Sequence, residues 1–243
     1  MRIPGDDPVA VALVLAVRGG DLGAIGQLLA EHPGLARARL VARNGVTRTP
    51  LHLAADWPGY FPNGPEVVKL LASAGADPSA PATGRDGQDT ETPLHWAASS
   101  DDVDVAAALI DGGADIEVPG GSIGTPLANA VGYGCWHVAR LLVARGARIG
   151  SLWQAAALGD RARVDEFLAA DPPPTSSDID AAFWQACHGG QRRMAEYLLA
   201  HGADINAVPG YAGGQSAFQA AGAADTMRQL LVGWLRERGA AEG

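Results

Sequence analysis

The sequence predicts an all-α solenoid, and three observations lead to this prediction. A seven-residue phrase that opens with Thr-Pro-Leu begins at Thr49, Thr92 and Thr125, so its copies stand 43 and 33 residues apart. A second phrase, an aliphatic pair followed by a Gly-Ala step, comes after each copy. Self-similarity at a period of roughly 20–50 residues is the signature of stacked repeats, in which each repeat is one small supersecondary unit.

Each repeat is interpreted as two helices joined by a turn. Thr49 is a typical helix-capping residue, and Pro50 occupies the first helical turn, where its missing N–H leaves no hydrogen bond unmade. The paired alanines that follow keep this helix thin, so that neighbouring repeats can approach closely. Leu70 and Leu71 give the second helix an apolar stripe, and Gly75 supplies the left-handed residue at which such helices commonly end.

The phrase Thr-Pro-Leu-His-x-Ala-Ala at residues 49–55 and 92–98, followed by Leu-Leu and Gly-Ala-Asp steps at a period near 33, resembles the ankyrin repeat. The resemblance implies a stack shaped like a cupped hand. It also implies that the motif histidines, His52 and His95, are structural and hydrogen-bond to neighbouring loops. In this family a binding site usually lies on the inner helices and hairpin tips, so the resemblance implies a binding function.

We expect about seven helix-turn-helix units, joined by short or irregular β-hairpin connections, in a single domain over residues 1–243. The first unit caps the stack and starts its first helix at Asp7 and Pro8. The three copies of the opening phrase begin the next three units, and degenerate copies near Ser151, Ala181 and Ser216 begin the last three. The expected units are residues 5–43, 44–87, 88–120, 121–149, 150–177, 178–209 and 210–240.

Two connections depart from the repeat. Residues 58–65, PGYFPNGP, carry three prolines in eight residues and therefore cannot continue a helix. We expect Tyr60 and Phe61 either to fold over the end of the binding groove or to pack on the adjoining turn. The connection between Gly146 and Ser151 is too short for a projecting hairpin.

The composition indicates a folded chain that does not bind nucleic acid. It is 47% apolar, and 27 acidic against 18 basic residues give a net charge of −9, whereas nucleic-acid binders carry basic surfaces. The apolar residues 9–17 follow two aspartates rather than a basic segment, and no apolar run approaches the roughly 18 residues of a membrane span. With two cysteines, we expect a cytoplasmic protein without a disulfide framework. A single lysine among the cations suggests a GC-rich genome of the bacterial type.

A binding groove is expected along one face of the first helices. The residue after the motif histidine shares a helix face with the residues three and four positions further on. Trp153 and Trp184 stand in the histidine slot itself, so we expect their bulk to replace the histidine hydrogen bonds there. The candidate ligand-binding residues on this face, in the histidine slot and on the proline-bounded loop are Asp56, Trp57, Tyr60, Trp96, Ser99, Asn129, Tyr133, Gln154, Trp184, Gln185 and His188.

The sequence favours a binding protein that holds a protein segment or peptide in its concave groove. The alternative is a small organic molecule, bound and transformed by acid/base chemistry in a pocket of Trp, Tyr, Asp and Asn side chains. A deep enclosed cavity would favour the small molecule, and an open shallow groove would favour the macromolecule. None of the common nucleotide, acyl-transfer or zinc-protease motifs is present. In an enzyme, acid/base chemistry would fall to Asp56 and His188.

Two Cys/His pairs raise the question of a metal site. Cys135 with His137 and Cys187 with His188 lie two repeats apart. Helices that pack about 8–10 Å apart would separate the pairs by on the order of 20 Å, too far for zinc bonds of about 2.0–2.3 Å or for a disulfide. We therefore expect neither a metal nor a cofactor.

Overall fold

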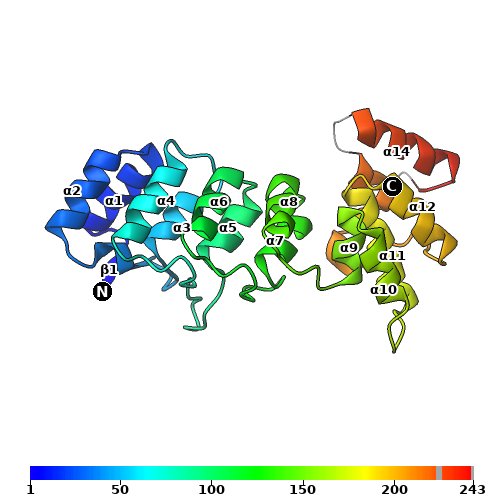
Figure 1. Ribbon diagram of the computed structural model, residues 1–243, viewed down its shortest axis with the longest axis horizontal. Coiled ribbons are helices and arrows are strands. Elements are labelled where there is room, and N and C mark those ends of the chain that lie inside the picture. The colour runs from blue at the N-terminus through cyan, green and yellow to red at the C-terminus, as the bar shows by residue number, and fades with distance from the viewer. Residues whose placement is uncertain (223–225, 242–243) are drawn as a thin grey trace. The chain divides into compact units, whose positions relative to one another are not determined.

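The Thr-Pro step begins the first helix of three successive helix pairs, as the sequence predicts. The computed structural model describes residues 1–222 and 226–241, and Figure 1 shows the helices following one another in pairs. In the first four pairs these are α1 (Pro8–Gly19) and α2 (Leu22–Glu31), α3 (Pro50–Ala55) and α4 (Gly64–Ser73), α5 (Pro93–Ser99) and α6 (Val103–Asp111), and α7 (Pro126–Gly132) and α8 (Trp136–Ala144).

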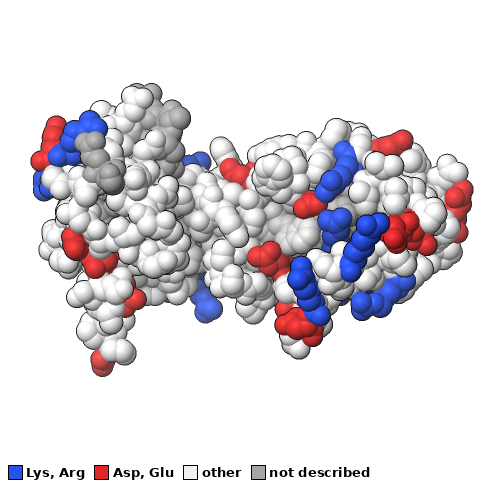
Figure 2. Space-filling model, turned by 180° about the vertical axis from the view of Figure 1, so that it is seen from behind, with Lys and Arg blue, Asp and Glu red and all other residues white. Residues whose placement is uncertain are grey.

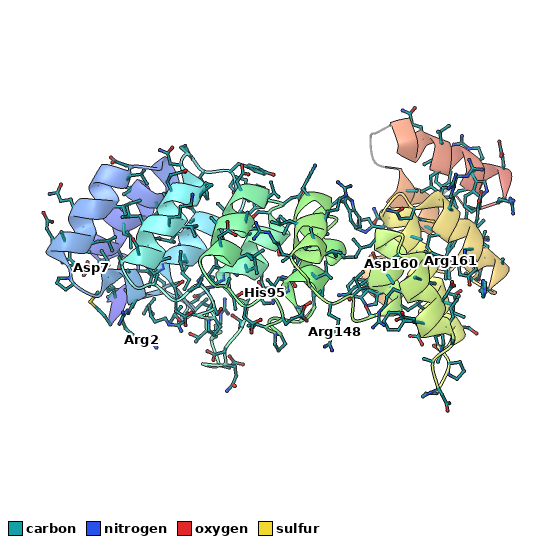
Figure 3. The ribbon with its side chains drawn as sticks, in the orientation of Figure 1. Arg2, Asp7, His95, Arg148, Asp160 and Arg161 are labelled. Carbon is teal, nitrogen blue, oxygen red and sulfur yellow. The ribbon has the colours of Figure 1, made fainter. Side chains whose placement is uncertain are left out.

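Three further pairs follow in the rest of the described chain. They are α9 (Leu152–Leu158) and α10 (Arg161–Leu168), α11 (Ser176–His188) and α12 (Arg192–Ala200), and α13 (Ala217–Ala221) and α14 (Thr226–Glu237), with short 3₁₀ turns η1 (Leu35–Arg37) and η2 (Gly210–Ala212) between elements. The expectation of an all-α solenoid of helix-turn-helix units is confirmed. Asp7 caps α1 through its side chain, as expected, and Asp160 caps α10 in the same way (Figure 3).

The motif histidines tie each first helix to the loop of the next repeat. Nδ1 of His52 accepts the backbone N–H of Thr49 at 3.1 Å, so the proton of the neutral ring lies on Nε2, which donates to the carbonyl oxygen of Glu91 at 3.1 Å. His95 repeats the arrangement with Thr92 and with the carbonyl oxygen of Gly124 at 2.9 Å. Both rings are buried, and their predicted structural role is confirmed.

A β-hairpin connection between the first two helix pairs was expected, but the third strand that completes a small sheet near the N-terminus was not. The sheet consists of β1 (Arg2–Pro4), β2 (Arg39–Val41) and β3 (Thr47–Arg48). β1 pairs in parallel with β2, Ile3 lying opposite Leu40, and β2 pairs antiparallel with β3. Strands of two or three residues are too short to show an alternating pattern, which explains why the sequence did not reveal them.

The chain forms two compact units, residues 1–148 and residues 149–243. The division falls in the short connection between Gly146 and Ser151. In each unit the first helices contain buried alanines. This agrees with the expectation that these helices are thin. None of the helices in residues 1–222 and 226–241 is both long and apolar enough to cross a membrane.

Candidate functional site

A hollow of about 420 Å³ opens on the first unit, at the C-terminal ends of its first helices α3 and α5 and beside the end of α7. We call it the aromatic hollow. It contains five of the predicted ligand-binding residues, together with two that the prediction omitted, Glu91 and Ser100. Its lining is Asp56, Trp57, Glu91, Trp96, Ser99, Ser100 and Tyr133. Six of the seven follow the histidine slot of their repeat by one, four or five positions, whereas Glu91 stands just before the cap of α5.

The walls of the aromatic hollow are open to solvent. Trp57 is 77% exposed and Tyr133 is 59% exposed, although both carry large apolar rings. Trp96 is half-buried and packs edge-on against His52, with ring centroids 4.8 Å apart and an interplanar angle of 79°. The hollow is therefore an open depression with aromatic walls and not an enclosed cavity.

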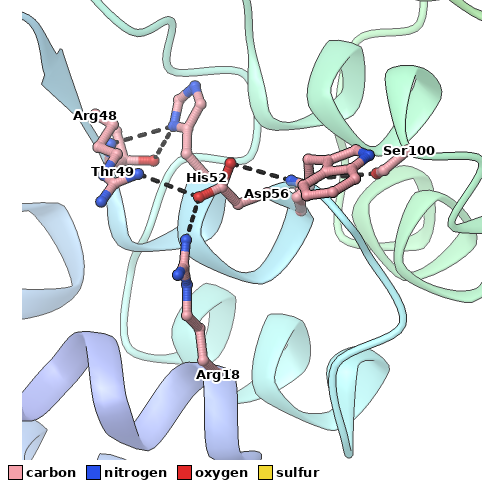
Figure 4. A network of polar contacts seen from close by, with 8 residues as sticks. Arg18, Arg48, Thr49, His52, Asp56 and Ser100 are labelled. Carbon is pink, nitrogen blue, oxygen red and sulfur yellow. Dashed lines mark hydrogen bonds and ion pairs between the residues drawn. The ribbon is translucent and has the colours of Figure 1, made fainter.

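Asp56 is held at one side of the hollow by two arginines from other elements (Figure 4). Its Oδ2 atom lies 2.5 Å from Nη2 of Arg18, on α1, and 3.2 Å from Nη1 of Arg48, on β3. Its Oδ1 atom accepts the backbone N–H of Trp57 at 3.0 Å. The two guanidinium groups balance the charge of this carboxylate and fix its position.

Glu91 enters the hollow from the connection before α5. Its Oε1 atom accepts a hydrogen bond of 2.8 Å from Nδ2 of Asn129, which also lies 3.2 Å from the hydroxyl of Ser99. No lysine or arginine forms an ion pair with Glu91 in the part of the chain that the structure describes. Asn129 was predicted to face a ligand, but its side chain is fully buried and instead positions Glu91 from behind.

The proline-bounded loop packs on both neighbouring turns. The backbone N–H of Tyr60 donates to Oδ2 of Asp102, and its phenol donates to the carbonyl oxygen of Asp101. Nδ2 of Asn63 donates to the carbonyl oxygen of Gly20 at 2.9 Å. A side chain on Gly20 would collide with the backbone of the loop, so only glycine allows this approach.

Tyr60 consequently does not line the aromatic hollow. Of the two arrangements expected for this loop, the structure shows the packed one and not a lip over the groove. Burial, together with the carboxylates of Asp101 and Asp102, raises the pKa of Tyr60, so the phenol keeps its proton and remains a donor at neutral pH. Phe61 of the same loop lies under the guanidinium of Arg18, 5.6 Å from its ring centre.

The candidates in the second unit lie mainly within its interior. Oε1 of Gln154 accepts the backbone N–H of Gly150 at 2.8 Å, and Gln185 is likewise buried. His188 stacks on Trp184 with ring centroids 5.2 Å apart. Asn129, Gln154 and Gln185 therefore pack in the interior, and helical spacing did not reveal this because it does not fix how far a helix is rotated toward its neighbours.

Trp184 corrects a second expectation. Its indole Nε1 donates to the carbonyl oxygen of Gln215 at 2.9 Å, and Gln215 immediately precedes Ser216, the cap of the next first helix. Glu91 and Gly124 hold the same position relative to Thr92 and Thr125. Trp184 thus preserves the link that the motif histidines make, and the prediction that bulk replaces that hydrogen bond is wrong at this position.

The two residues named for acid/base chemistry belong to different compact units. Asp56 lies in the first compact unit and His188 in the second, so neither unit contains both. Both cysteines are buried and unpaired; burial raises the pKa of Cys135 to about 11 and that of Cys187 further still. Across residues 1–222 and 226–241, no group of three or more His, Cys, Asp or Glu side chains is placed to hold a metal ion.

Comparisons with known proteins agree with this architecture. The family profile described as three copies of ankyrin repeats matches residues 63–151, and a single ankyrin-repeat profile matches residues 180–208. Residues 63–151 and 180–208 therefore carry ankyrin repeats. It is 29% identical over 222 residues to the B-cell lymphoma 3 protein homolog of Mus musculus, an alignment that covers 90% of this chain and 41% of that protein. The chain thus spans about two fifths of the length of this relative.

Solved structures of ankyrin repeat domains are similar over most of the chain. The ankyrin repeat domain of Bcl-3, described as a unique member of the IkappaB protein family, gives a TM-score of 0.53 at 27% identity, covering 93% of this chain and 97% of that one. The human ASB11 ankyrin repeat domain gives 0.50 at 20% identity, with coverages of 90% and 96%. The latter likeness shows the fold alone.

Proposed function

We propose that this chain is a protein-binding ankyrin domain that holds a segment of a partner protein in the aromatic hollow. The observation that carries the proposal is the pair of exposed rings, Trp57 and Tyr133, at an open hollow that has a third aromatic residue, Trp96, in its lining. Large aromatic side chains are enriched among the residues that dominate binding at protein interfaces. All seven lining residues belong to the first unit.

A protein segment fits the site better than a small organic ligand. The volume of about 420 Å³ falls in the range of small-molecule sites, roughly 300–1,000 Å³. Such sites, however, bury about 70–90% of their ligand, whereas here Trp57 and Tyr133 stand open to solvent. An extended segment can cover these rings with residues on either side of the one that enters the hollow. The same proposal places the protein in the cytoplasm, where buried thiols such as Cys135 and Cys187 stay reduced.

The proposal is tested with peptides selected from a random display library on the full chain. Trp57→Ala and Tyr133→Ala should each weaken the binding of the selected peptides by about tenfold or more, since a central aromatic anchor contributes on the order of 1–2 kcal/mol. Because both side chains are largely exposed, the melting temperature of each variant should stay within a few degrees of the parent. Isothermal titration calorimetry and thermal unfolding provide the two measurements.

Two exposed side chains outside the hollow serve as matched controls. Leu15, on α1 and 68% exposed, and Tyr211, in the second unit and 60% exposed, are replaced by alanine in the same way. These variants should bind the selected peptides as the parent does. If all four substitutions have equal effects, or if no peptide binds while a small metabolite raises the melting temperature, the hollow is not a site for a protein segment.

A further inference from the structure

The two carboxylates of the aromatic hollow differ in their charge balance. Asp56 is paired with Arg18 and Arg48, whereas Glu91 has hydrogen bonding from the neutral amide of Asn129 and no ion pair among the described residues. None of the seven lining residues is a lysine or an arginine. Glu91 therefore leaves one negative charge in the hollow that no ion pair within the described residues balances, and this charge would repel an anionic ligand.

The aromatic walls favour the same sign of ligand charge. Trp57, Trp96 and Tyr133 line the hollow together with Glu91. A cation over the face of a tryptophan or tyrosine ring is attracted by the negative face of the π system, by about 0.5–1 kcal/mol at exposed sites and more when water is excluded. Three such rings and one unbalanced carboxylate form a recognition site for a positive group that also carries apolar surface.

We propose that the aromatic hollow receives an arginine side chain of the partner segment, with the guanidinium group stacked on the aromatic walls and paired with Glu91. The inference rests on the proposed function and specifies its anchor. Arginine fits better than lysine because its guanidinium group is planar, stacks on aromatic rings, presents a two-pronged donor edge to a carboxylate and is more weakly hydrated than an ammonium group. Asn129 acts as a positioning residue, since its Nδ2 atom holds Oε1 of Glu91 at 2.8 Å.

The preference for a cationic anchor depends on Glu91 rather than on the charge of the wider surface. On the face of the first unit that Figure 2 shows, basic and acidic side chains are interspersed, with no field of one sign. Arg18 and Arg48 both form ion pairs with Asp56, which is one of the lining residues. The preference for a cation thus comes from one carboxylate, that of Glu91, among aromatic side chains. Replacing Glu91 by a neutral residue should remove this preference.

The test compares arginine with citrulline, its neutral counterpart of nearly the same shape, in the peptides selected on the full chain. The selected peptides should share an arginine, and its replacement by citrulline should weaken binding by about tenfold or more, with lysine intermediate. Glu91→Gln keeps an acceptor for Asn129 and removes the charge, so it should bind the arginine and citrulline peptides with nearly equal affinity. Glu66→Gln, at an exposed position on α4, should leave the tenfold preference intact.

Each outcome decides between the two proposals. If the peptides respond to Trp57→Ala but bind equally well with citrulline, or if Glu91→Gln and Glu66→Gln behave alike, the arginine anchor is wrong and the protein-binding function stands. Equal binding of lysine and arginine peptides would also overturn the assignment to arginine. If no selected peptide responds to Trp57→Ala or Tyr133→Ala, both proposals fail. Thermal unfolding of Glu91→Gln shows whether a loss of binding reflects a loss of fold.

Discussion

His52 and His95 are neutral structural groups at the centre of the first unit. Each ring accepts from the backbone of its own helix cap and donates to the loop of the next repeat, which leaves neither nitrogen available for chemistry. Burial lowers the pKa of His52 from its ordinary value to about 4 and lowers that of His95 as well. The charged form of either ring would break the hydrogen bond that Nδ1 accepts.

The stability of the protein should therefore fall as the pH drops from about 6.5 toward 4. In that window the unfolded chain binds a proton at position 52 and the folded chain does not, so protonation favours unfolding. The contribution from His52 is fully present above pH 6.5 and should lose on the order of 3 kcal/mol by pH 4, at about 1.4 kcal/mol per pKa unit. Urea denaturation at a series of pH values measures this loss.

Two variants separate the contribution of His52 from that of the carboxylates. His52→Gln lowers stability at neutral pH but should flatten its dependence on pH between 6.5 and 4. His201→Gln, at an exposed position on the second unit, should retain the slope of the parent protein. An unchanged slope in His52→Gln would mean that other groups cause the loss of stability in acid.

At the scale of secondary-structure elements, neighbouring repeats supply one another's helix caps. Cys135 stands at the N-cap of α8 and gives it no side-chain hydrogen bond. Asp101, from the preceding repeat, accepts the backbone N–H groups of His137 and Val138 on Oδ1, each at 3.0 Å, and lies 2.6 Å from Nδ1 of His137 through Oδ2. One carboxylate therefore satisfies the free donors of a helix to which it does not belong.

Removal of this cap should destabilise the first unit by about 1 kcal/mol, within a range of roughly 0.5–2 kcal/mol. Asp101→Gly is the appropriate substitution, because φ at this position is 54° and alanine would add backbone strain there. Asp101→Asn should retain most of the stability, since asparagine caps helices about as well as aspartate and tolerates the left-handed conformation. Equal stability of the glycine and asparagine variants in urea denaturation would show that the cap contributes nothing.

At the scale of the whole molecule, the net charge of −9 favours association with a basic partner. Long-range attraction of this kind acts mainly on the rate of encounter, and salt screens it. Raising the ionic strength from about 0.01 to 0.15 M shortens the Debye length from about 30 to about 8 Å. Under the proposed function, this charge steers a basic segment toward the protein, and the aromatic hollow then selects the side chain that is bound.

The association rate of an arginine-containing selected peptide should accordingly fall as salt is raised, with a much smaller change in its dissociation rate. Stopped-flow fluorescence of the exposed Trp57 provides the measurement. The citrulline form of the same peptide carries one positive charge fewer and should show a weaker dependence on salt. The same dependence for both peptides would contradict a role for this charge in steering.

The amino-acid sequence was enough to predict the helix pairs, their Thr-Pro and Asp caps and the structural role of His52 and His95. These features depend on residues close together in the chain and on a repeat that multiplies a local signal. Helical spacing also placed Asp56, Trp57, Trp96, Ser99 and Tyr133 around one hollow, because residues that share a helix face recur in each repeat at the same offsets from the motif.

Contacts between distant parts of the chain determine which of those residues face solvent and which carboxylate is balanced by an arginine. Arg18 and Asp56 are 38 positions apart in the sequence, and so are Glu91 and Asn129. No local sequence pattern predicts contacts at this separation. The burial of Asn129, Gln154 and Gln185 depends on how far each helix is rotated against its neighbours. Packing of neighbouring repeats fixes that rotation. Because both arginines pair with Asp56, Glu91, which was absent from the prediction, is the one unbalanced carboxylate in the lining of the hollow.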